Sequence, residues 1–296
     1  MPLRIVQSKQ NSRLKELRRA IAHPGQGAAG LVGIEGPNLL NEALRAGLRL
    51  HAVFIAKGSE HLLEGLTLPL EIDVLLLPLE LLTSALVTET PQPIAALVEP
   101  PDWTWAHLLG CHRKTSPLVV VLAGLQDPGN LGTILRSAEA FGATGVLSLP
   151  GTVSEWNPKA VRASAGSVFR LPLLSVGEKD CFARLRKAGV IIWTTAVHGA
   201  EPADRIDLAG PVALMIGNEG NGVAQALAAQ ADRALTIPCP GPVESLNAAV
   251  AASVLLYEAS RQRSTRMSKP SGSPQLSSKE SNRGAVPHAA DRGARR

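Results

Sequence analysis

Residues 118–141 read LVVVLAGLQDPGNLGTILRSAEAF and contain three kinds of sequence in succession. Residues 118–122 form a continuous apolar run, which is typical of a strand in a parallel sheet covered on both faces. A short loop of polar residues, proline and glycine follows, and apolar residues then recur at helical spacing over 131–141. The stretch therefore predicts a strand, a loop and a helix, which is the repeating unit of a doubly wound α/β domain.

This alternation of strands and helices continues to residue 261. Further strands are expected at 145–149, 190–195, 212–216 and 234–237, and further helices at 158–165, 180–188, 223–230 and 246–261. The sequence therefore predicts a domain over residues 118–263 with a parallel sheet and helices on both faces.

The rest of the chain divides into three segments. Residues 1–100 alternate helical stretches with strand-like runs and predict a small α/β domain. Residues 101–117 begin and end with proline and are predicted to be a linker. Residues 264–296 are rich in serine, proline, glycine and charge, so they are predicted to be a disordered tail.

The composition excludes several classes of protein. Of the 296 residues, 45% are hydrophobic, and no apolar run approaches the roughly 20 residues of a transmembrane helix. The basic N-terminus lacks the apolar stretch of a secretory signal, so we expect a cytoplasmic protein without membrane association. Cys111, Cys181 and Cys239 show no paired spacing. Neither a disulfide framework nor a metal site is therefore expected, and buried thiols are the simpler interpretation.

Positive charge is concentrated at the two ends of the chain. The net charge is +5; residues 1–20 hold six cations and one anion, and residues 264–296 hold seven cations and two anions. Basic ends around a mildly acidic body favour a polyanionic partner such as nucleic acid. Solubilising termini without a partner are the alternative.

Three loops that follow predicted strands carry the candidate functional residues, because open parallel sheets bind ligands beyond the carboxyl ends of their strands. The first, 126–132, contains Asn130 and leads into the helix that carries Arg136. The second, 217–222, reads GNEGNG, and the third, 238–247, reads PCPGPVESLN. Simpler interpretations stay open: Asn130 as a helix N-cap, Arg136 as a solvated side chain, and the second loop as a plain turn. A serine in the third loop is expected to cap the final helix.

Together the three loops resemble the signature motifs of the SpoU/TrmH family of RNA ribose 2′-O-methyltransferases, part of the SPOUT class. The resemblance covers residues 118–261, and a further family-like stretch, NPKAVRASAGSVFRLP, occupies residues 157–172. Residues 1–100, including the segment 34–43, look like the substrate-binding domain of many members, which is similar to a ribosomal-protein RNA-binding fold. The resemblance also implies a deep trefoil knot built from the second and third loops, which periodicity alone does not predict.

The resemblance implies a catalytic site and a cofactor site. S-adenosylmethionine would bind in the knot. The positions that match the family's cofactor contacts are Thr195, Ala196, Gly217, Asn218, Ile237 and Leu246. The catalytic positions carried over are Arg136, Asn130, Glu219, Ser245 and Asn247. Arg136 is implied to lie nearest the target hydroxyl, and a homodimer is implied in which the partner completes each active site.

The activity that the resemblance implies is methylation of a ribose 2′-hydroxyl in RNA, with S-adenosylmethionine as the methyl donor. The additional N-terminal domain favours large-subunit (23S) rRNA as the substrate over tRNA. The same reaction on a tRNA ribose and a catalytically silent RNA-binding assembly factor are the alternatives. A nucleotide-dependent dehydrogenase is disfavoured, because the glycines do not follow G-x-G-x-x-G.

Overall fold

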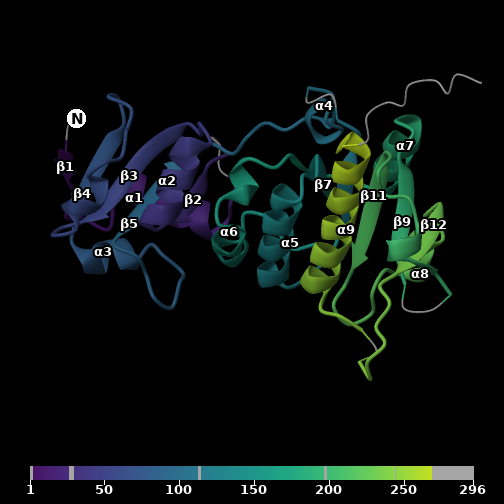
Figure 1. The fold of residues 1–296 in the computed structure, drawn as a ribbon. Coiled ribbons are helices and arrows are strands. Elements are labelled where there is room, and N and C mark those ends of the chain that lie inside the picture. The colour runs from purple at the N-terminus through teal and green to yellow at the C-terminus, as the bar shows by residue number, and fades with distance from the viewer. Residues whose placement is uncertain (1–2, 27–29, 113–114, 197–198, 244, 269–296) are drawn as a thin grey trace, which may run out of the picture.

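The computed structural model describes residues 3–26, 30–112, 115–196, 199–243 and 245–268. The chain forms two sheets, each with its own helices (Figure 1). We call residues 3–98 the N-terminal unit and residues 105–268 the C-terminal unit.

The N-terminal unit contains a mixed five-stranded sheet in the order β1-β4-β3-β5-β2. Strands β1, β4 and β3 are parallel, whereas β5 pairs antiparallel with both β3 and β2. The strands are β1 (Leu3–Ile5), β2 (Val32–Glu35), β3 (Leu50–Ala56), β4 (Asp73–Leu77) and β5 (Ile94–Val98), and the helices are α1 (Ser12–Ala22), α2 (Pro37–Arg45), the 3-10 helix η1 (Glu60–Leu63) and α3 (Leu79–Thr83).

The C-terminal unit contains a seven-stranded sheet in the order β10-β12-β9-β11-β6-β7-β8, in which every pair is parallel. Its strands are β6 (Leu118–Ala123), β7 (Gly145–Ser148), β8 (Leu173–Ser175), β9 (Ile191–Thr195), β10 (Glu201–Pro202), β11 (Val212–Gly217) and β12 (Arg233–Thr236). Its helices are α4 (Trp105–Leu108), α5 (Pro128–Ala140), α6 (Pro158–Ser164), η2 (Ser167–Phe169), α7 (Glu178–Lys187), η3 (Ala203–Arg205), α8 (Gln225–Ala228) and α9 (Ala248–Ser268).

Helices cover both faces of this parallel sheet, as expected for a doubly wound domain. On β6, Val120 packs in the apolar cluster that contains α5 and α9, and its neighbour Val121 packs in the cluster that contains α7. Side chains on a strand alternate between the two faces, so an uninterrupted apolar strand needs cover on both sides. The predicted parallel α/β architecture is confirmed.

In the C-terminal unit, the short strands β8 and β10 and the α-helix α4 were not expected. Strands β8 and β10 have only three and two residues, too few to show a periodic pattern. Within the predicted linker, α4 buries Leu108 against the C-terminal unit, and a Cβ on Gly145 of β7 would lie 2.8 Å from the Leu108 side chain. Part of this segment therefore packs as a structural element.

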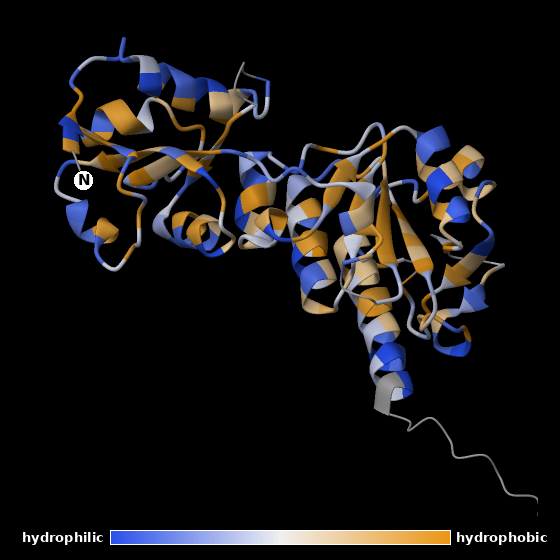
Figure 2. Cartoon of the chain, turned by 90° about the horizontal axis from the view of Figure 1, so that it is seen from above, coloured by the Kyte–Doolittle hydropathy of each residue, from blue (hydrophilic) through white to orange (hydrophobic). Residues whose placement is uncertain are grey.

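The last helix is longer than predicted. It continues to Ser268, so residues 264–268 are helical and not part of a tail; the rest of the predicted tail lies outside the described residues. Arg263 anchors this end, because its guanidinium donates to the carbonyls of Ser116, Pro117 and Gly210. The hydrophilic last turns extend past the body of the unit (Figure 2).

Of the three cysteines, one is buried as expected and two are exposed. Cys181 is buried, and this burial, with a smaller contribution from Asp180, raises the pKa of its thiol to about 12. Cys111 and Cys239 are exposed: Cys111 lies in the turn after α4, and Cys239 lies in the proline-rich third loop. Within the described ranges, no helix combines the length and the hydropathy needed to cross a bilayer.

Candidate active site

The three candidate loops follow β6, β11 and β12, so they all lie at the carboxyl edge of the seven-stranded sheet. Strands β6, β11, β9 and β12 are consecutive neighbours in that sheet. Loops far apart in the sequence are therefore brought to one edge, where ligands of open α/β sheets bind.

The first loop ends in an N-cap that Asp127 provides. Its Oδ1 accepts a hydrogen bond from the backbone N–H of Asn130 at 2.7 Å, and its Oδ2 lies 3.2 Å from Nζ of Lys159. The backbone hydrogen bond from Asn130 is the main reason that the pKa of Asp127 is lowered, with Lys159 adding to the effect. Pro128 then occupies the first helical position, where its missing N–H costs nothing. The N-cap role considered for Asn130 is therefore wrong.

Gly132, in the first turns of α5, allows this helix to pack closely against α6. A Cβ on Gly132 would lie 2.5 Å from both the carbonyl oxygen of Ala160 and the Cβ of Ala163. A side chain there would push the two helices apart.

The Glu219 carboxylate connects the second loop to the first. It accepts hydrogen bonds from the backbone N–H of Asp127 at 3.1 Å and of Gln126 at 3.4 Å, and from Nδ2 of Asn130 at 3.0 Å. Desolvation alone would raise the pKa of Glu219, but the hydrogen bonds, led by the one from Asn130, lower it overall. Because the carboxylate form accepts all three bonds, Glu219 is ionised at neutral pH.

The third loop joins the same network through Asn247. Its Nδ2 donates to Oδ1 of Asn130 at 3.1 Å, and its Oδ1 accepts from the backbone N–H of Ala249 at 2.9 Å. Asn247, not the serine two residues earlier, therefore caps α9, and the prediction for Ser245 is corrected. Asn130 thus lies between Glu219 and Asn247 and links all three loops.

The glycines of the second loop are explained mostly by the turn itself. Asn218 and Gly222 exchange backbone hydrogen bonds of 2.9 Å each, and a Cβ on Gly217 would collide with the backbone of Gly222 and Val223. Gly222 also has a φ of +64°, which favours glycine. The side chain of Asn218 donates to the Gly124 carbonyl at 3.1 Å and so holds this turn against the first loop.

Arg136 lies on a different part of α5 from Asn130. Six residues of helix correspond to about 9 Å along the axis and place the two side chains on different faces. Arg136 is exposed, and no hydrogen bond or ion pair connects it to any residue that the structure describes. Within one chain, its guanidinium is therefore separate from the network of the three loops.

The positions matched to cofactor contacts lie at the ends of β9, β11 and β12 and in the third loop. The Thr195 hydroxyl donates to the Met215 carbonyl at 3.0 Å, and the Ala196 N–H donates to the Leu235 carbonyl at 2.9 Å. Ile237 is half-buried against the core, whereas Ser245 and Leu246 are exposed in the third loop.

These residues fit S-adenosylmethionine in one specific respect. Beside Thr195, the buried Oγ1 of Thr194 has no hydrogen-bond partner among the described residues. A buried polar atom without a partner is costly, and a bound polar ligand can satisfy it. In the described part of the chain, no three His, Cys, Asp or Glu residues lie close enough together to hold a metal ion.

The sequence motifs did not reveal two residues of this region. Asp127 belongs to the first loop, but only Asn130 is considered there as a possible N-cap, although a carboxylate before Pro128 is itself an N-terminal signal. Thr194 lies inside an apolar strand, and no sequence pattern shows that its hydroxyl lacks a partner.

Comparison with known proteins identifies the family. Residues 117–257 match the model of the SpoU rRNA Methylase family, and residues 34–104 match a model described as RNA 2′-O ribose methyltransferase substrate binding. The 23S rRNA (guanosine(2553)-2′-O)-methyltransferase RlmP of Bacillus subtilis (strain 168) is 32% identical over 252 residues, which cover 85% of this chain and 97% of that protein.

Solved structures agree with this assignment. The SpoU methyltransferase AviRb from Streptomyces viridochromogenes, in complex with AdoMet, superposes with a TM-score of 0.75 at 29% identity over 86% of this chain and 99% of that one. An AdoMet-bound rRNA methyltransferase from Sinorhizobium meliloti gives a TM-score of 0.74 at 29% identity over 88% of this chain and 98% of that one. The chain belongs to the SpoU family of S-adenosylmethionine-dependent RNA 2′-O-ribose methyltransferases.

Proposed function

We propose that this enzyme methylates a ribose 2′-hydroxyl in large-subunit ribosomal RNA, in the cytoplasm and as a homodimer. The observation that carries the proposal is the hydrogen-bonded network in which Asn130 joins Glu219 and Asn247, since it assembles three family motifs at one sheet edge. The choice of rRNA is supported by the 23S rRNA methyltransferase activity for which the Bacillus subtilis relative is named and by the substrate-binding match of residues 34–104.

The cofactor site is proposed at the ends of β9, β11 and β12. When bound there, S-adenosylmethionine supplies a methyl group on a positively charged sulfur, so the protein has to orient the hydroxyl rather than activate the methyl group. The residues proposed to hold it are Thr195, Ala196, Gly217, Asn218, Ile237 and Leu246. The network around Asn130 keeps the loops that carry these residues in place.

Arg136 is proposed to act on the ribose hydroxyl. Its positive charge stabilises the negative charge that develops on the oxygen, or holds the adjacent phosphate. Ser245 is proposed to contact the substrate from the third loop, while Asn130, Glu219 and Asn247 fix the geometry of the site.

A homodimer explains the outward face of α9. Val250, Val254 and Tyr257 recur at helical spacing and are 49%, 41% and 56% exposed. The Tyr257 ring also packs edge-on against Phe141 at the end of α5, with centroids 5.7 Å apart. A partner that covers this face would lie beside the helix that carries Arg136 and could complete the site with it.

The trefoil knot is proposed from the course of the chain after β12. In the sheet, β12 is separated from β11 by β9. The chain after β12 nevertheless returns to α9, which packs against β11 and against α5, the helix that follows β6. The third loop makes this crossing beside the second loop, which is where the family knot would form.

The division of labour along the chain is part of the same proposal. Residues 1–100 would bind RNA, and residues 118–263 would carry out catalysis. Residues 101–117 would connect these two domains, and the basic C-terminal segment would add non-specific affinity for RNA.

The substrate is tested with RNA from a strain that lacks the enzyme. Ribosomal and transfer RNA are separated, incubated with the protein and labelled S-adenosylmethionine, and the methylated ribose is mapped. We expect label at one nucleotide of the large-subunit rRNA. Label in the tRNA fraction would replace rRNA by tRNA as the substrate, and no label in either would support the silent assembly factor.

A further inference from the structure

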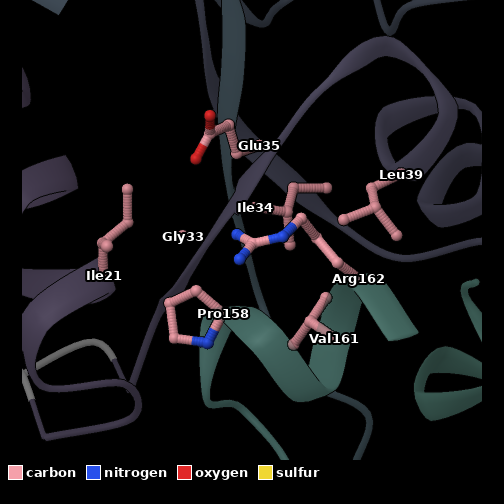
Figure 3. A pocket seen from close by; sticks show the side chains of 8 residues that line it. All are labelled: Ile21, Gly33, Ile34, Glu35, Leu39, Pro158, Val161 and Arg162. Carbon is pink, nitrogen blue, oxygen red and sulfur yellow. The ribbon is translucent and has the colours of Figure 1, made fainter. Parts of the chain in front are cut away.

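Two family-like stretches that lie outside the three candidate loops meet between the two units. Segment 34–43 comprises the end of β2 and most of α2, and segment 157–172 comprises α6, η2 and the following turn. Ile34 and Leu39 pack against Pro158 and Val161 around a narrow pocket, and Arg162 extends from α6 across it (Figure 3). One continuous apolar cluster runs through this contact.

Arg170 is the residue that connects these stretches by charge. Its Nη1 lies 2.6 Å from Oε2 of Glu42 on α2. Its Nε and Nη2 lie 2.6 and 3.0 Å from the two oxygens of Glu139 on α5. The hydrogen bonds that Arg170 donates, first to Glu139 and then to Glu42, raise the pKa of Arg170. One guanidinium therefore joins the N-terminal unit to the helix that carries Arg136.

The three side chains of this ion-pair network are partly buried. The side chains of Arg170, Glu42 and Glu139 are only 33%, 25% and 31% exposed, so solvent screens their interaction less than at an open surface. Gly166 approaches Glu42 so closely that a Cβ on it would lie 2.6 Å from the Glu42 Cβ, and its φ of +87° also favours glycine. A bidentate pairing of guanidinium with carboxylate fixes direction as well as distance.

Apolar packing leaves part of the junction open. A cavity of about 540 Å³ lies between the units and is lined by the 87–90 loop and Gln92 on one side and by Lys159 and Arg162 on the other. Close packing leaves few voids larger than a water molecule, so this cavity marks a part of the junction where the units do not interdigitate. The interactions of Arg170 lie outside this cavity and supply a directional constraint.

We propose that Arg170 is a positioning residue that fixes the orientation of the N-terminal unit relative to α5, so that RNA bound by that unit presents its ribose to Arg136. The proposal rests on the proposed function. Glu139 lies three residues after Arg136 on the same helix. Holding α5 and the RNA-binding unit through one side chain sets their relative placement before RNA arrives.

The test uses Glu42→Gln, which removes the charge of the N-terminal carboxylate, and Arg170→Lys, which keeps the positive charge but cannot form the fork to Glu139 while reaching Glu42. The control is Arg184→Lys, since Arg184 pairs with Asp180 at 2.7 Å within α7, away from the junction. Methylation kinetics are measured with the mapped RNA, and S-adenosylmethionine binding is measured by calorimetry.

We expect both junction variants to raise the KM for RNA about three- to tenfold, because only the fraction of molecules in the correct orientation binds productively. The kcat at saturating RNA and the cofactor affinity should stay within twofold of the wild type, as should every parameter of Arg184→Lys. A variant that only loses stability would have a lower melting temperature with an unchanged KM, and that result would overturn the proposal.

Orientation is measured independently of catalysis. Spin labels are placed at Leu70, which is 84% exposed on the N-terminal unit, and at Glu201 on β10, in a variant whose exposed Cys111 and Cys239 are replaced by serine. Labelled chains are diluted with unlabelled protein. The distance distribution should broaden in Glu42→Gln and Arg170→Lys. An unchanged distribution contradicts the positioning role, whereas broadening in a protein that methylates no RNA keeps it and rejects the proposed function.

Discussion

Asn130 and Glu219 show how two side chains can assemble a site from distant loops. Both were recognised as motif residues, but their physical role depends on Asp127, which caps α5 and so leaves the Asn130 side chain to bond Glu219 and Asn247. A sequence pattern gives the spacing of an N-cap but does not decide between neighbouring Asp and Asn residues. The contact between residues 130 and 219 is set by the sheet order, which no local pattern contains.

Glu219→Gln should make the stability of the fold depend less on pH in the acidic range. The pKa of Glu219 is below its usual value of 4.5 in the folded chain, so the carboxylate stabilises the fold fully above pH 4.5, and this contribution is lost as the pH falls through the lowered folded pKa. Melting temperatures of both proteins are compared between about pH 3 and pH 7. The wild type should be the more stable at neutral pH, with the difference shrinking in acid. A difference that is constant over this range contradicts the assignment.

Helix α9 was predicted from its small and apolar residues, but two of its features were not. Its cap is Asn247, and it continues to Ser268 because polar side chains such as Arg263 bond to the C-terminal unit. Strands β8 and β10 were missed for a different reason: a strand of two or three residues is defined by pairing with its neighbour, not by its own pattern. The long apolar strands and the amphipathic helices were predictable because their periodicity is local.

Val254→Asp should separate the proposed dimer. A carboxylate on the exposed apolar stripe of α9 would have to be buried without a partner in the interface, which is strongly unfavourable. Sedimentation velocity should show monomers, and methyl transfer should fall at least tenfold. Leu70→Asp, the same kind of change at an exposed site on the other unit, should remain dimeric and active. A fully active monomer of Val254→Asp would refute the shared site.

At the scale of the whole molecule, positive and negative charges are distributed unevenly along the chain. Basic residues dominate both ends, while the three candidate loops lie in the mildly acidic middle. The parallel sheet and the two units could be predicted from alternating strands and helices. The packing of segment 34–43 on segment 157–172 could not, because it depends on how two separately folded sheets meet.

Truncation after Ser268 tests the basic C-terminal segment without shortening α9. The segment removed holds six cations and two anions, so its contacts with RNA phosphates release few counterions and weaken with salt. RNA affinity should fall several-fold at about 50 mM salt and little at about 200 mM salt. Equal affinities of the two proteins at both salt concentrations would show that the segment does not contribute to RNA binding.

The most direct test of the central claim is methyl transfer from labelled S-adenosylmethionine to rRNA by Arg136→Ala. Arg184→Ala, which removes another exposed arginine far from the candidate loops, is the matched control, and cofactor binding is measured for both. The account predicts that Arg136→Ala loses at least a hundredfold in rate while it binds the cofactor as the wild type does, and that the control stays active. Wild-type methyl transfer by Arg136→Ala would contradict it.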